Sequence, residues 1–216
     1  MRADGSGQRG RGRPHVSALT PESVGGDIRG LVRFASPGTQ TGTVAGTVTE
    51  SGSDGDRKTR VAASGWYELK ALAPGDYRET FTPNDNSTEF VSLKLSIPVN
   101  GSCVGSGVRL GNVTVSGSVS DESGKPISGA DVFLFYALDG HFHPDVALKT
   151  RADADGRFSF HRVEAAKFIL SARLPSSEMT FFPGTHDASK TEIIEVYDGK
   201  PVSGLTVRVP RSSQSK

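Results

Sequence analysis

Two histidines at alternate positions have the best spacing for a metal site in this chain. In a strand, His141 and His143 would lie on one face, where Asp145 or His186 could complete the coordination of an ion. The same segment also fits a polar loop, because Pro144 and the residues before His141 are typical of turns. We favour the loop, and we therefore expect neither a metal nor any other cofactor.

Other reactive side chains lack the neighbours that their chemistry requires. Cys103 is the only cysteine and has no basic residue beside it, so we expect a small buried side chain at the start of a strand. The run Asp153-Ala-Asp155-Gly156 lacks the spaced oxygen ligands of a calcium loop and favours a hairpin turn. No G-x-S-x-G elbow, phosphate-binding loop or dinucleotide fingerprint occurs. We therefore expect no enzymatic activity.

Composition argues against several further classes of function. The 25 basic and 24 acidic residues among 216 nearly cancel, so the overall charge does not favour nucleic acid as a partner. No stretch approaches 18 consecutive apolar residues, so we expect no insertion into a membrane. The single cysteine excludes an intrachain disulfide framework.

The elements that must position these residues are strands, because apolar and polar residues alternate with a period of two. Turns rich in glycine, proline and aspartate separate the alternating runs, which are 28–34, 67–70, 113–120, 158–161 and 205–209. Only 162–168 and 187–194 offer a helical turn. The pattern predicts an all-β fold of packed antiparallel sheets, with Phe158 and Phe160 in the space between them.

The chain also repeats itself. Apolar residues recur at an offset of 91 between Gly65–Tyr77 and Gly156–Phe168, and shorter matches lie before and after them. The repeat predicts two tandem domains, 23–111 and 112–210, which touch end to end through a linker of a few residues near Gly111.

The two ends of the chain differ in composition from the repeats. Residues 1–22 are rich in glycine, arginine and serine, and 211–216 are polar, so we expect a disordered leader and a disordered tail. No secretory signal peptide is visible, because no apolar segment follows the basic start.

The second repeat reads GSVSDESGKPISGADV over 117–132 and DGRFSF over 155–160. This succession resembles the carboxypeptidase regulatory-like family, a transthyretin-like (prealbumin-like) β-sandwich domain. The first repeat keeps GWYELKALAPGDY over 65–77 but lacks the G-x-P-[LIV]-x-G-A segment, and the second has Ala165-Ala166 where the family has Pro-Gly. The resemblance implies two tandem antiparallel sandwiches of this kind.

The resemblance further implies a noncatalytic accessory module, acting as a structural spacer or interaction surface in an exported bacterial protein, extracellular or periplasmic. We expect a monomer whose partner is another protein or a glycan. The alternative is a carbohydrate-binding module, in which exposed aromatic rings would stack on sugars, and the candidate residues are Trp66, Tyr136, Phe142 and Phe181. Trp66 is out of phase with Tyr67 and Leu69, so its ring should point outward.

Overall fold

The computed structural model describes most of the two repeats, over residues 25–34, 45–85, 88–138, 141–175 and 177–210. The predicted leader and tail lie outside these residues, so both stay predictions. Strands dominate the described chain, which confirms the all-β prediction. One short 3-10 helix falls inside the segment 187–194, where the sequence offered a helical turn.

The elements in chain order are β1 (Gly26–Phe34), β2 (Gly46–Gly52), β3 (Gly55–Arg60), β4 (Trp66–Leu72), β5 (Gly75–Pro83), β6 (Glu89–Ile97), β7 (Cys103–Leu110), β8 (Val113–Asp121), β9 (Asp131–Leu138), β10 (His141–Arg151), β11 (Arg157–Val163), β12 (Lys167–Arg173), β13 (Thr180–Phe181), η1 (Ala188–Lys190), β14 (Ile193–Glu195) and β15 (Val202–Val209).

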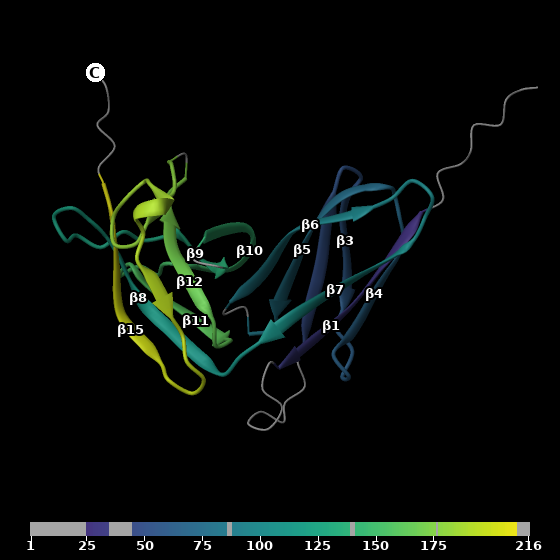
Figure 1. Cartoon of the computed structure of the whole chain (residues 1–216), viewed down its shortest axis with the longest axis horizontal. Coiled ribbons are helices and arrows are strands. Elements are labelled where there is room, and N and C mark those ends of the chain that lie inside the picture. Colours follow the sequence, from purple (N-terminus) through teal and green to yellow (C-terminus); the bar gives the residue numbers. More distant parts are fainter. Residues whose placement is uncertain (1–24, 35–44, 86–87, 139–140, 176, 211–216) are drawn as a thin grey trace, which may run out of the picture.

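These strands form three sheets. Two small sheets have the orders β4-β1-β7 and β11-β8-β15, and one nine-stranded sheet has the order β13-β12-β9-β10-β6-β5-β2-β3, with β14 also paired to β12. Figure 1 shows one small sheet in the N-terminal half of the molecule and the other in the C-terminal half. Pairing is antiparallel except that β1 pairs with β7, and β8 with β15, in parallel. Periodicity does not predict these parallel pairs, because alternation is the same in both kinds of ladder.

The same backbone features recur in both halves at the offset found in the sequence. Ala71 and Arg162, which are 91 residues apart, both have a positive φ, of 54° and 60°, although neither is glycine. Gly65 and Gly156, also 91 apart, have φ of 87° and 72° at the turn before β4 and before β11. The sequence repeat is therefore also a repeat of local structure.

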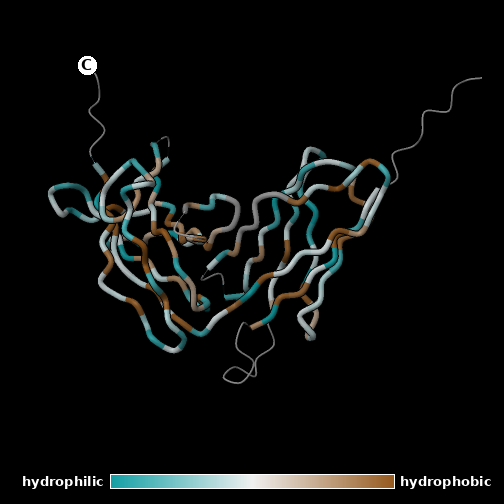
Figure 2. Tube along the Cα trace, in the orientation of Figure 1, coloured by the Kyte–Doolittle hydropathy of each residue, from teal (hydrophilic) through white to brown (hydrophobic). Residues whose placement is uncertain are grey.

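Most buried apolar side chains form one cluster that extends through both halves. Phe158 and Phe160 belong to it and are 4% and 0% exposed, as the alternation predicts. Along the strands, apolar residues alternate with polar ones in the trace of Figure 2.

The two halves also share a sheet, because β6 of the first repeat pairs with β10 of the second. Glu89 to Ser92 lie opposite Lys149 to Val146, so the nine-stranded sheet runs without interruption from one half to the other. This contact is broader than the end-to-end contact that we expected from a short linker. The division into domains 23–111 and 112–210 stays a prediction.

Candidate functional site

The predicted aromatic residues do not gather on one surface. Trp66 projects from β4 in the N-terminal half and is 56% exposed, as its phase predicts. Tyr136 on β9 is partly buried, packs against Phe168, and donates its hydroxyl hydrogen to Glu164 Oε1 at 2.7 Å. Phe142 and Phe181 do meet, with ring centroids 5.4 Å apart. Carbohydrate binding by these residues stays a prediction.

Phe142 and Phe181 belong to a second aromatic cluster that the sequence did not single out. Phe133 and Phe135 complete it, on the face of the nine-stranded sheet that is turned away from the core residues of β9. The guanidinium of Arg173 lies 5.5 Å from the centre of the Phe133 ring. Phe135 and Phe181 are 5% and 6% exposed, whereas Phe133 and Phe142 are only partly buried.

The histidine candidates lie at the start of strand β10, where His141 and Phe142 pair with Leu138 and Ala137, so the polar loop that we favoured for this segment is wrong. His143 is half-buried, whereas the side chains of His141 and Asp145 lie outside the part of the chain that the structure describes. Among the described residues, no three histidine, cysteine, aspartate or glutamate side chains lie close enough together to hold an ion. His161 is exposed, in line with its outward phase.

Two other sequence expectations have different outcomes. Cys103 is exposed, so the expectation of a buried side chain is wrong; the residue begins the edge strand β7, on which alternate side chains face solvent. The run 153–156 forms the expected turn, in which Asp153 Oδ1 accepts from the backbone of Asp155 and of Arg157 at 2.9 and 2.8 Å.

A junction between the two halves adds side-chain contacts to the shared sheet. At its centre Glu164, which is 9% exposed, accepts from Tyr136 through one oxygen and pairs with Arg109 Nε of β7 at 3.0 Å through the other. Burial, and then the neighbouring Glu164 carboxylate, raise the pKa of Tyr136.

Residues His161 and Arg162, where the pairing of β11 with β8 is irregular, also contact the first half at this junction. Arg162 reaches Asp85 at 2.8 Å, and the amide of His161 donates to Thr88 Oγ1 at 2.8 Å. Gly111 donates its amide to the carbonyl of Arg162 at 2.7 Å, and a Cβ on Gly111 would lie 2.0 Å from the carbonyl oxygen of Val163. Only glycine fits here without a shift of the backbone.

An acidic cluster lies inside the N-terminal half and has no counterpart in our sequence predictions. Glu50 of β2 and Glu79 of β5 stand opposite each other and are 0% and 1% exposed. Glu79 accepts from the hydroxyls of Tyr67 and Ser106 at 2.7 and 2.6 Å, so β4 and β7 reach it from the other sheet. Burial, and then the neighbouring Glu79, raise the pKa of Glu50 to about 9.

The sequence does contain a signal for this cluster. Glu50 is in phase with buried Val48, and Glu79 is in phase with buried Tyr77 and Phe81, so both carboxyls occupy core positions of their strands. A charged residue at a core position of an alternating strand is uncommon enough to mark a special environment.

Comparison with known proteins does not identify a family. No protein-family model matches the chain, and no curated protein matches it. Solved structures that resemble it include the TIE protein of Bacillus anthracis (14% identity, TM-score 0.32, covering 87% of this chain and 34% of that one) and a streptococcal ancillary pilin (10%, 0.34, 89% and 64%). A third is a Bacteroides uniformis protein provisionally described as carbohydrate-binding (9%, 0.34, 80% and 100%).

This chain thus spans about a third of the length of the first of these proteins and less than two thirds of the second. At these TM-scores the likeness supports no argument about activity or partners. The carboxypeptidase regulatory-like family, the export and the lack of enzymatic activity all stay predictions. In the described part of the chain, no helix is long and apolar enough to cross a membrane.

Proposed function

We propose that this chain is a noncatalytic spacer, in which two β-sandwiches are fixed as one rigid arm that holds or presents a partner outside the cytoplasm. The pairing of β6 with β10 carries the proposal, because backbone hydrogen bonds between the repeats oppose bending at the linker. A flexible pair of domains would need only the connection at 111–112.

Contacts at the junction support the same role. Three contacts link the two repeats beside the linker: the Arg162–Asp85 ion pair, the hydrogen bond from His161 to Thr88, and the Glu164–Arg109 ion pair. Each of these contacts joins a residue of the first repeat to a residue of the second, so together they oppose rotation of one half against the other.

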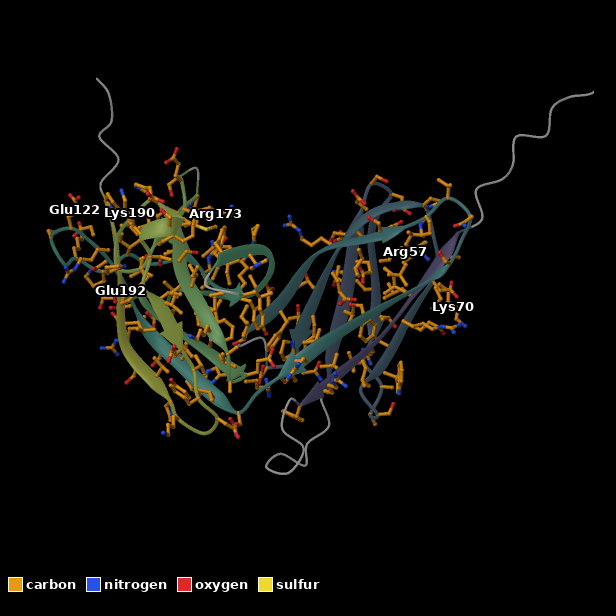
Figure 3. The ribbon with its side chains drawn as sticks, viewed as in Figure 1. Arg57, Lys70, Glu122, Arg173, Lys190 and Glu192 are labelled. Atoms are coloured by element: carbon orange, nitrogen blue, oxygen red, sulfur yellow. The ribbon has the colours of Figure 1, made fainter. Side chains whose placement is uncertain are left out.

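The distance between the two halves tests the proposal. Dyes on Lys70→Cys and Lys190→Cys, in a Cys103→Ser background, would report it, because Lys70 and Lys190 are exposed and lie in opposite halves (Figure 3). We expect a single narrow distribution of energy-transfer efficiencies. Gly111→Ala should broaden or shift it, because the added Cβ displaces the backbone at 163–164.

Gly105→Ala is the matched control, since a Cβ on Gly105 meets nothing within 4 Å. It should leave the distribution unchanged. A broad distribution in the parent protein, of the width expected for two domains on a flexible tether, would contradict the rigid spacer.

A further inference from the structure

The acidic cluster of the N-terminal half brings together two carboxyls and two hydroxyls from four strands. Both hydroxyls donate to Glu79: Tyr67 to Oε2 and Ser106 to Oε1. Both oxygens of Glu50 are fully buried, and no described hydroxyl, amide or cationic group donates to them. The neighbour of Glu50 is the Glu79 carboxyl, with which it can form a hydrogen bond only if one of the two is protonated. An ionised carboxylate in this state would lose its hydration without compensation, which is among the most costly arrangements in a protein interior.

Among the side chains that the structure describes, no cation pairs with Glu50 or Glu79. In the register of the large sheet, Arg57 of β3 lies opposite Glu50, but Arg57 is exposed and makes no ion pair with it. On the facing sheet, the residue of β1 beside Tyr67 is Gly30, which has no side chain to contribute. The other ionisable groups around Glu50 in the described part of the chain are Tyr67 and Tyr77. The Tyr77 hydroxyl lies 2.8 Å from the carbonyl oxygen of Ala73 and 3.2 Å from Asp54 Oδ1, so it is oriented away from Glu50.

We propose that Glu50 and Glu79 hold one proton between them in the folded chain, and that the N-terminal half loses stability when this proton leaves. Glu79 is the carboxylate, because it accepts two hydroxyl hydrogens, and Glu50 carries the proton. The pair goes beyond the spacer role: it makes the stability of the arm depend on pH.

The direction of the dependence follows from linkage. In the unfolded chain Glu50 titrates near its ordinary pKa of 4.5, whereas in the folded chain its pKa is raised to about 9. Between these values unfolding releases a proton, so the stabilisation is complete below about 4.5 and is lost as the pH rises toward 9. The unfolding equilibrium constant should rise by up to about tenfold per pH unit in this range.

Urea unfolding of the full chain at pH 5, 7 and 9 tests the proposal, followed by the fluorescence of Trp66, which lies next to Tyr67 on β4. The urea midpoint of the parent protein should fall steadily as the pH rises. Glu50→Gln keeps the size of the side chain and cannot ionise, so it should remove most of this fall and raise the midpoint at pH 9.

Glu68→Gln is the matched control, because Glu68 is a solvent-accessible carboxylate on β4 paired with Arg29 and Lys70. It should retain the full fall in midpoint between pH 5 and 9. Equal pH dependence in the parent and in Glu50→Gln would overturn the proposal.

Two further measurements keep the proposal testable if Glu50→Gln does not fold. The infrared spectrum of the folded parent protein at pH 7 should contain the carbonyl band of a protonated carboxylic acid, and this band should vanish above pH 9. Its absence at pH 7 would overturn the proposal. So would a rise in the urea midpoint on adding calcium or magnesium, since the pair would then bind a cation in place of a proton.

Discussion

Glycine matters at the residue scale where two strands leave no room for a side chain. Gly30 of β1 and Gly117 of β8 occupy corresponding positions in the two small sheets, each opposite an aromatic residue, Tyr67 and Phe158. A Cβ at Gly30 would lie 2.1 Å from Cζ of Tyr67, whereas a Cβ at Gly117 would lie 2.7 Å from Cζ of Phe158 and 2.1 Å from the carbonyl oxygen of Leu205. In each half the ring fills the space over the glycine.

Gly30→Ala and Gly117→Ala should each destabilise the chain by about 1–3 kcal/mol or more, because the Tyr67 ring must move in the first variant, and the Phe158 ring and the backbone at Leu205 in the second. The free energy of unfolding in urea measures the effect. Gly105→Ala, on the strand next to β1, meets no neighbour within 4 Å and should change stability by less than either variant. An equal loss of stability in all three variants would mean that the loss does not arise from the close contacts at Gly30 and Gly117.

Residue-scale prediction from the sequence succeeded where phase alone decides burial. Phe158, Phe160 and Trp66 lie on the predicted faces because a strand leaves each side chain only two directions. It failed for Cys103, because phase cannot tell whether the strand lies at the edge or the centre of a sheet. It also missed Glu50 and Glu79, whose environment depends on which strands face each other.

At the scale of the element, β3 lies at one end of the nine-stranded sheet. Its residues Arg57, Lys58 and Arg60 are exposed, and the strand pairs on one side with β2. An unpaired edge can template pairing with another chain, and basic side chains along it oppose that contact by repulsion and desolvation.

Arg60→Thr should raise self-association, because threonine favours strands and carries no charge. Static light scattering over a range of protein concentrations would record it. Arg78→Thr is the comparison, since Arg78 is exposed on β5, a strand paired on both sides. Equal self-association in both proteins would assign the effect to net charge and not to the edge.

The sequence predicted five of the fifteen described strands, but not which strands pair with one another. Alternation located the segments that became β1, β4, β8, β11 and β15, because one face of each is buried. The parallel pairs and the pairing of β6 with β10 depend on which edges remain free after the repeats fold. The alternation of apolar and polar residues within one strand does not say which other strand it will pair with.

At the scale of the whole molecule, one buried cluster and one sheet join the repeats. Unfolding of either half would expose the β6–β10 edge and the apolar residues beneath it. The halves should therefore unfold together, although their sequences repeat.

Phe160→Ala tests this coupling, because Phe160 is fully buried in the C-terminal half and its loss should cost about 3–5 kcal/mol. Hydrogen exchange should then accelerate in β5 of the N-terminal half as well as in β12. Tyr197→Ala, an aromatic residue that is 57% exposed, should leave both strands protected. Faster exchange confined to β12 would show that the halves are independent.

The parallel pairing of β1 with β7, and of β8 with β15, has a mechanical consequence. In each half the entering and the leaving strand lie side by side and run in the same direction, over eight paired positions in the first half. A force that pulls the start of the first strand away from the end of the second acts along the strands, so it shears one strand past the other. All the lateral hydrogen bonds are then loaded together, so each half resists tension far better than a hairpin that opens one bond at a time.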